Sequence, residues 1–223
     1  MPARKCKSCV MRIASALLLC VFLIAGDAAE EPRPLAGEAL VDVRAACPGV
    51  VVELRYESAR NAAGHAIYPV AARCLLRKSV AARLLAAQKL VVADGFRLKV
   101  WDAYRPPSAQ AALWTARPNP DFVADPTKGG SLHGWGVAVD VTLVDQFGRE
   151  LKMPTDFDEI GSRAARRYRG TDPGVARNLH LLQQAMAKAG FLAMRDEWWH
   201  FAAADYRSFG PVEPPASIDP RKP

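Results

Sequence analysis

The sequence predicts an α+β domain in which helices pack on a small, mainly antiparallel sheet. Strand-like and helix-like segments are interspersed along the chain, but they lack the regular alternation that a doubly wound parallel sheet requires. They also lack the glycine-rich phosphate loop that such sheets often carry. The 223 residues are 50% hydrophobic and 24% charged, which is typical of globular proteins. We therefore expect a single domain.

The first thirty residues have the pattern of a secretory signal peptide. An apolar run over residues 13–25 is followed by small residues and preceded by four basic ones, Arg4, Lys5, Lys7 and Arg12. The run is shorter than the roughly 20 residues that span a bilayer, so we expect cleavage and no stable membrane insertion afterwards. The sequence thus predicts a signal peptide over 1–28 and an exported protein, periplasmic or secreted.

Three further parts are expected after the signal peptide. Residues 31–38 are polar and rich in proline, which predicts a tether over 29–45. The catalytic domain is expected over 46–212 and a disordered tail over 213–223. The predicted signal peptide contributes four basic residues and one acidic residue, so the net charge falls from +7 to +4 without it. Because no basic stripe interleaved with aromatic residues remains, we expect no nucleic-acid partner.

The sequence of the first half of the domain predicts two strands and a helix. A β-branched run favours a strand over 50–56, and alternating apolar residues favour another over 96–103. Ser79 is expected to cap a helix that runs to about Asp94 and ends at Gly95. Its buried face is expected to consist of Val80, Leu84, Ala87 and Val91.

The second half repeats this mixture with a long irregular segment inside it. A helix is expected to follow Ser108 and to end before Pro118, ahead of a loop over 118–130. A strand is predicted over 137–143, an irregular excursion over 144–172, and a final strand over 198–202. Between the last two, Asp172 and Pro173 open a helix that ends near Gly190.

Two cysteines remain in the predicted mature chain. Cys47 and Cys74 form an even pair in a protein expected to reach an oxidising compartment. We predict a disulfide between them, although two buried free thiols are the alternative.

Two short patches contain the residue types of a hydrolytic metal site. The run over 131–140 contains His133 and Asp140, and the run over 197–200 contains His200. A catalytic zinc takes three nitrogen or oxygen ligands from the protein and leaves its fourth position to water. Because side chains alternate along a strand, Asp140 points away from the apolar face, and a permissive glycine loop can bring His133 over it. We predict one zinc ion held by these three residues.

Glu197 is the candidate proton acceptor of this site. It lies three residues before His200, which is the wrong parity for a shared strand face. The strand is therefore expected to begin at or after Trp198, with Glu197 on the incoming turn, or else the segment is helical. In either arrangement Glu197 can reach the attacking water without binding the metal.

The pair of motifs SxHxxGxAxD and ExWH resembles the zinc D-Ala-D-Ala dipeptidases of the D-alanyl-D-alanine metallopeptidase superfamily. Two further segments agree in order and spacing, namely WDAYRP over 101–106 and the pair Phe157 and Asp158. The resemblance runs from about Tyr56 to Phe201, which is nearly the whole predicted domain. The doubled tryptophan after Glu197 is similar to the dipeptidases, whereas the carboxypeptidase branch usually has proline there.

The resemblance implies a role for each matched residue. His133, Asp140 and His200 would bind zinc, and Glu197 would act as general base and acid. Arg105 would stabilise the oxyanion, while Tyr56 and Asp158 would receive the substrate ammonium and Ser131 its carboxylate. The implied reaction is hydrolysis of D-Ala-D-Ala, so the expected partner is a small D-amino-acid dipeptide or a peptidoglycan-derived peptide.

Three other functions fit parts of the pattern. A D,D-carboxypeptidase or L,D-peptidase of the same superfamily, acting on peptidoglycan stem peptides, would suit an exported protein. An iron(II) oxygenase also uses two histidines and a carboxylate, but its His and Asp lie two residues apart rather than seven. A non-catalytic zinc module is disfavoured because Glu197 and Arg105 are both present.

Overall fold

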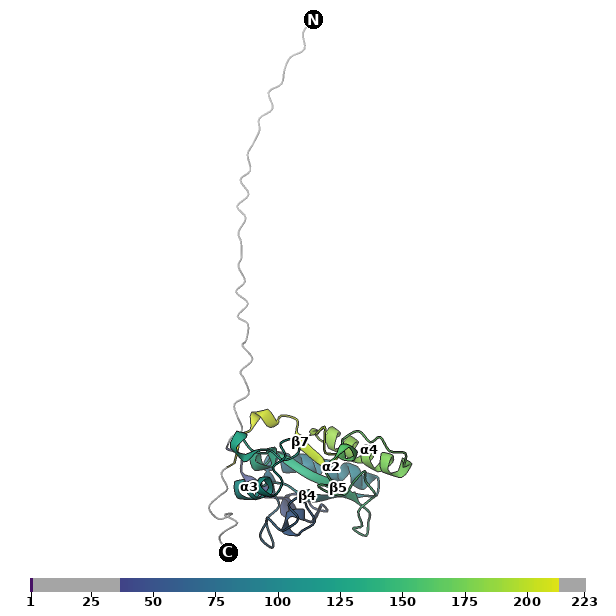
Figure 1. The fold of residues 1–223 in the computed structure, drawn as a ribbon. Helices are drawn as coiled ribbons and strands as arrows, with labels where there is room; N and C mark the ends of the chain where they lie inside the picture. The colour runs from purple at the N-terminus through teal and green to yellow at the C-terminus, as the bar shows by residue number, and fades with distance from the viewer. Residues whose placement is uncertain (2–36, 213–223) are drawn as a thin grey trace. The chain divides into compact units, whose positions relative to one another are not determined.

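The computed structural model describes Met1 and residues 37–212. The predicted signal peptide beyond Met1, the first part of the predicted tether and the predicted tail lie outside these residues. Every described helix and strand belongs to one compact unit over Arg33–Pro223. Helices and sheets are mixed in it (Figure 1), which confirms the predicted α+β class. No helix in the described part of the chain is long and apolar enough to cross a bilayer.

The main sheet has five strands in the order β2-β4-β5-β7-β6. Their bounds are β2 Val51–Val52, β4 Arg97–Asp102, β5 Ala138–Val144, β6 Phe191–Ala193 and β7 His200–Ala203. Only the β2–β4 pairing is parallel, and the other three are antiparallel. The central strand β5 is buried along its whole length, so its register determines where the polar side chains of the sheet meet.

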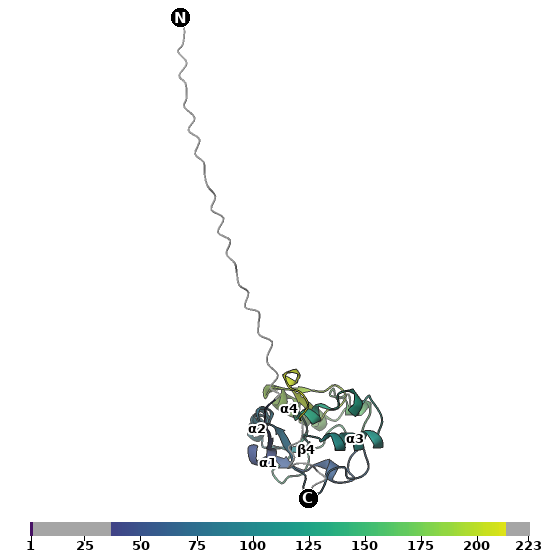
Figure 2. The ribbon, with the colours of Figure 1, turned by 90° about the vertical axis from the view of Figure 1, so that its left-hand side faces the viewer.

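The described residues form four α-helices, of which α2 and α4 contact the sheet most extensively, α3 follows β4 and the short α1 follows β1. The helices are α1 Val43–Ala46, α2 Lys78–Ala93, α3 Pro107–Ala116 and α4 Pro173–Lys188. Helix α2 contacts β4, α4 contacts β5, and the two helices pack on each other. In the view of Figure 2, α2 and α3 lie on opposite sides of β4. The apolar side chains of β5, Val139, Val141 and Leu143, belong to the hydrophobic core.

The start of helix α4 agrees with the sequence, whereas that of α2 does not. The Asp172 side chain accepts hydrogen bonds from the backbone N–H groups of Gly174 and Val175, as expected of an N-cap. Ser79, the predicted cap of α2, instead lies inside its first turn. The Glu38 carboxylate accepts from both the Ser79 backbone N–H and the Ser79 hydroxyl, each at 2.7 Å. Glu38, 41 positions earlier in the chain, thus supplies the hydrogen-bond acceptor for a backbone N–H group in the first turn of α2.

Part of the predicted tether belongs to the folded domain. Strand β1, Leu40–Asp42, pairs antiparallel with β3, Leu75–Arg77. Val43 directly after β1 is fully buried. The tether over 29–45 is therefore too long, because its last residues bury apolar surface and pair in a sheet.

Two predicted strands are shorter than expected, and three observed ones have no counterpart in the predictions. The predicted strand over 50–56 is reduced to β2, because the chain turns into a 3-10 helix over Arg55–Glu57. The predicted strand over 198–202 begins only at His200, so Glu197 lies on the incoming turn, as one of the two alternatives requires. Strands β1, β3 and β6 have only three residues each, too few for a visible alternation.

The predicted disulfide between Cys47 and Cys74 is wrong in the structure, where both thiols are free and buried. The Cys47 thiol donates to the carbonyl oxygen of Ala81 in α2 at 3.2 Å. It is therefore directed at the helix instead of at a second sulfur. Burial raises the pKa of Cys47 to about 11 and that of Cys74 well above its ordinary value.

Arg77 at the end of β3 connects three distant segments. Its guanidinium is buried and donates to the backbone carbonyls of Glu38 at 3.2 Å, Trp135 at 2.8 Å and Gly210 at 2.8 Å. It also lies 5.2 Å from the ring centroid of Phe209. One side chain thus links both ends of the folded unit to the turn over Leu132–Trp135.

Candidate metal centre

His133 is held on a short 3-10 turn, Leu132–Trp135, directly before β5. The Ser131 hydroxyl caps this turn by accepting from the His133 backbone N–H at 3.2 Å. Gly136 ends the turn with φ +69°, a conformation that glycine adopts without strain. The His133 Nδ1 atom lies 2.6 Å from the Ala103 carbonyl oxygen, which can only accept. Nδ1 therefore carries the proton, and the lone pair of Nε2 is left for a metal.

Asp140 and His200 are cross-strand partners on β5 and β7. Asp140 is 2% exposed, and the side chain of His200 is 12% exposed. On the other side of β5, the register with β4 shifts between Val100 and Asp102, so Asp102 stands opposite Asp140. Trp101 is the extra residue of this β-bulge, a device that re-aims side chains near functional sites. The bulge aligns Asp102, Asp140 and His200 in one row across three strands.

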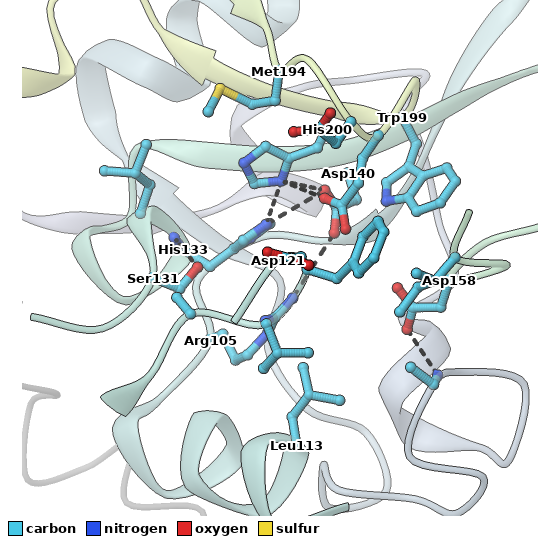
Figure 3. A pocket seen from close by; sticks show the side chains of 18 of the residues that line it. Arg105, Leu113, Asp121, Ser131, His133, Asp140, Asp158, Met194, Trp199 and His200 are labelled. Carbon is cyan, nitrogen blue, oxygen red and sulfur yellow. Dashed lines mark hydrogen bonds and ion pairs between the residues drawn. The ribbon is translucent and has the colours of Figure 1, made fainter. Parts of the chain in front are cut away.

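Three donor atoms converge at the end of this row (Figure 3). The His200 Nδ1 atom lies 2.9 Å from Asp140 Oδ1 and 3.0 Å from His133 Nε2, and the Asp140–His133 distance is 3.4 Å. A tetrahedral ion with bonds of about 2.1 Å places its ligand atoms about 3.4 Å apart. Within the described residues these three side chains form the group that could hold a metal ion. The structure thus brings together the three ligands that the sequence predicts.

Charge around the site favours an anionic Asp140. Burial would raise the pKa of Asp140, but the neighbouring His133 and His200 outweigh burial and hold it well below its ordinary value. Glu197 differs, because burial raises its pKa to about 7. Its Oε2 atom lies 3.9 Å from His200 Nδ1, which is close to the donor atoms but too far for a direct hydrogen bond. Glu197 is therefore placed to exchange a proton near neutral pH.

Arg105 is buried beside the candidate metal ligands. Its Nη2 atom lies 3.9 Å from Asp140 Oδ2 and donates to the Tyr56 hydroxyl at 3.3 Å. The guanidinium also lies 4.7 Å from the Tyr56 ring centroid, and Nη1 donates to Gln110 Oε1 at 3.0 Å. Burial would lower the pKa of Arg105, but Tyr56 and Asp102 outweigh it, so the pKa is raised and the cation is retained.

The eight residues predicted for metal binding, catalysis and substrate binding all line one cavity of about 350 Å³. Asp158 borders it on the side away from the histidines (Figure 3). It has φ +57° and accepts from the Ala62 backbone N–H at 2.9 Å, and burial raises its pKa to about 6. Tyr56 is buried against Tyr68 and Phe157. Ser131 also lines the cavity, although its hydroxyl oxygen caps the His133 turn.

Asp102, Tyr68 and Gln110 surround Arg105 but were not predicted as site residues. Asp102 is fully buried and accepts two hydrogen bonds from Arg105. The side-chain oxygen of Gln110 accepts a third from the Nη1 atom of Arg105. Asp102 is the second residue of the WDAYRP motif, so its place in that motif could have identified it as a site residue. The apolar part of the cavity wall was also not predicted; it includes Leu113, Phe122, Val123 and Met194.

Several known proteins resemble this chain in sequence. A family model described as "D-ala-D-ala dipeptidase" matches residues 37–212. The chain is similar to the D-alanyl-D-alanine dipeptidase of Escherichia coli K12, with 40% identity over 76% of this chain and 87% of the relative. It is 31% identical to that of Enterococcus faecalis, over 60% of this chain and 75% of the relative. A solved vancomycin-resistance D,D-pentapeptidase, VanY, matches with 17% identity and a TM-score of 0.39, over 62% of this chain and 78% of that one.

Proposed function

The chain belongs to the D-Ala-D-Ala dipeptidase family of metallopeptidases, and from this premise we propose that it hydrolyses free D-Ala-D-Ala to two D-alanines with one zinc ion. The observation that carries the proposal is the meeting of His133 Nε2, Asp140 Oδ1 and His200 Nδ1 within 3.4 Å of one another. Two imidazoles and one carboxylate are a donor set of catalytic zinc.

The donor set also fits zinc in its surroundings. The proton on His133 Nδ1 is fixed by the Ala103 carbonyl, which is the usual support of a metal-binding imidazole. Asp140 is anionic, so it would neutralise part of the charge of a divalent ion. A zinc ion bound there supplies a Lewis acid that makes water acidic enough to act as a nucleophile near neutral pH.

In this proposal Glu197 and Arg105 perform the proton transfer and the charge stabilisation. Glu197 accepts the proton of the attacking water and returns it to the leaving amine, for which a pKa near 7 is suitable. Arg105 stabilises the oxyanion that forms on the scissile carbonyl. Its four hydrogen bonds to Asp102, Gln110 and Tyr56 use four of its five N–H groups, and one remains for substrate.

Asp158 provides the selectivity for a free dipeptide. Its carboxylate borders the cavity opposite the histidines and would pair with the substrate ammonium in a partly buried setting. Tyr56 would form the wall beside that ammonium, and Ser131 would approach the substrate carboxylate at the other end of the cavity.

The experiment is an assay of D-alanine release by the purified, zinc-loaded protein. Free D-Ala-D-Ala should be cleaved, and its N-acetylated form, which lacks the ammonium, should be cleaved at least tenfold less well. Chelation should abolish the activity and added zinc should restore it. A variant of the exposed His65, His65→Ala, serves as the control and should behave as the wild type. Absence of D-alanine release from the zinc-loaded protein would refute the proposal.

A second cavity favours the alternative of a stem-peptide carboxypeptidase. It has a volume of about 420 Å³, shares Asp158, Ala62 and Ile160 with the first, and adds Arg117, Asn119 and Glu159. It lies where residues preceding the dipeptide could extend. Preferential cleavage of an N-acylated stem peptide in the same assay would support this alternative.

We also propose that the protein is exported. The support is the basic and apolar pattern over 1–28, which falls outside the described residues. Expression of the full chain followed by cell fractionation and N-terminal sequencing tests it. A mature N-terminus near residue 29 outside the cytoplasm is expected, and an uncleaved cytoplasmic protein would contradict it.

A further inference from the structure

We propose that Asp102 is a positioning residue that holds the Arg105 guanidinium and the His133 imidazole in a fixed relation to each other. This inference rests on the proposed function only for the part that concerns turnover. The argument starts from the β-bulge at Trp101, which places Asp102 instead of Trp101 opposite Asp140.

The Asp102 carboxylate is completely buried, and both of its oxygens are engaged. Oδ2 accepts from Arg105 Nη2 at 2.6 Å and from Arg105 Nε at 3.0 Å, while Oδ1 accepts from the Tyr68 hydroxyl at 2.6 Å. A carboxylate that binds two nitrogens of one guanidinium fixes both its position and its plane. Tyr68, itself buried, prevents the carboxylate from rotating.

The same Oδ2 atom lies 3.3 Å from His133 Nδ1. The nearer acceptor of that nitrogen is the Ala103 carbonyl at 2.6 Å, so Asp102 stands beside this hydrogen bond as a second negative group. Partners of this kind keep the protonated nitrogen away from the metal side of the ring and increase the basicity of the other nitrogen. One carboxylate thus contacts both the oxyanion-stabilising cation and a metal ligand.

The other hydrogen-bond partners of Arg105 could not hold its guanidinium in this position without Asp102. Arg105 is held otherwise by the neutral groups of Gln110 and Tyr56, at 3.0 and 3.3 Å. Without the Asp102 anion, the nearest carboxylate is Asp140, whose Oδ2 atom is 3.9 Å from Arg105 Nη2. The guanidinium would then be drawn toward a metal ligand and compete with the metal for it. Asp102 prevents this competition.

The test is the nearly isosteric variant Asp102→Asn, alone and combined with Arg105→Ala. Alone, it should lower kcat by about 10- to 100-fold and change KM less than about threefold. In the Arg105→Ala background it should change kcat less than about threefold, because no guanidinium remains to be positioned. Equal fold losses in both backgrounds would overturn the Arg105 part of the proposal.

The His133 part has a readout that does not depend on activity. Zinc affinity, measured by chelator competition, should fall about tenfold in Asp102→Asn and by the same factor in the double variant. Unchanged zinc affinity would overturn this part. Because zinc affinity is measurable without a substrate, a failure of D-Ala-D-Ala hydrolysis in the wild type is distinguishable from a failure of this proposal.

A matched control is provided by Asp205. Its carboxylate binds both terminal nitrogens of Arg83, at 2.6 and 2.7 Å, and neither of these two residues lines the cavity of the metal ligands. Asp205→Asn should leave kcat and zinc affinity unchanged. If Asp102→Asn fails to fold, Tyr68→Phe decides: reduced kcat with an unchanged Tm supports the proposal, and wild-type kcat overturns it.

Discussion

Asp140 and His200 are direct partners across β5 and β7, and their side chains meet with 2.9 Å between Asp140 Oδ1 and His200 Nδ1. Sixty residues of chain separate them, but the antiparallel register fixes them on the same face of the sheet. The candidate metal site therefore rests on the strands β5 and β7, and His133 and Glu197 are supplied by turns. The strands thus fix two of the three candidate ligands, and the turns add the third together with the candidate proton acceptor.

Replacing Glu197 with glutamine should separate metal binding from turnover. Glu197→Gln keeps the shape of the side chain but cannot accept a proton, so kcat should fall by about 100- to 10,000-fold. Zinc content, measured by atomic emission on the purified protein, should remain that of the wild type, because Glu197 is not among the three donors. Loss of zinc together with activity would instead make Glu197 a ligand.

The affinity for the dipeptide should decrease in acid because of Asp158. Burial raises its pKa to about 6, and only the ionised carboxylate attracts the substrate ammonium. As the pH falls through 6 the neutral form accumulates, so KM should rise about tenfold between pH 7 and pH 5. In Asp158→Asn the KM should be high and independent of pH over this range. A pH-independent KM in the wild type would remove Asp158 from ammonium binding.

Gly136 should be intolerant of any side chain. A Cβ atom there would lie 2.7 Å from Leu40 Cδ2, and its φ of +69° is unfavourable for other residues. Gly136→Ala should lower the free energy of unfolding by about 2 to 4 kcal/mol, as the sum of strain and overpacking. Gly64 is the matched control, because its φ is +72° but no atom lies near its Cβ position. Gly64→Ala should cost only about 1 kcal/mol; equal losses by thermal unfolding would discount the contact with Leu40.

Cys47 and Cys74 should be reduced and unreactive in the native protein. With the pKa of Cys47 raised to about 11, roughly one thiol in a thousand is ionised at pH 8. Iodoacetamide should therefore modify neither thiol in the folded protein and both after denaturation without a reductant. Labelling that requires a reductant as well would restore the disulfide that the sequence alone suggests.

The sequence predicts the metal site better than it predicts the ends of the elements. Strand alternation predicts that Asp140 lies on the polar face of β5. The parity of Glu197 excludes it from the strand face of His200 and leaves a turn or a helical segment, and both inferences follow from local geometry. The cap of α2 is different, since Glu38 reaches Ser79 only after β1 has paired with β3. Such a contact depends on tertiary structure and leaves no local pattern.

The role of Asp102 was missed for a related reason. Alternation along residues 96–103 assumes a regular strand, in which Trp101 would oppose Asp140. The bulge inverts this assignment and brings Asp102 next to Arg105, three positions later. A one-residue irregularity is invisible in the sequence, although it decides which side chain enters the site.

Through Arg77, residues near both ends of the described domain are connected to the turn that carries His133. Its guanidinium needs the carbonyls of Glu38 and Gly210 in addition to that of Trp135, two residues beyond His133. Trimming the protein past either outer carbonyl would remove one of the backbone acceptors of this buried cation, beside the turn that carries His133. Shortened versions prepared for crystallisation or display on a carrier should therefore retain both ends, because Arg77 connects these ends to the turn that carries His133.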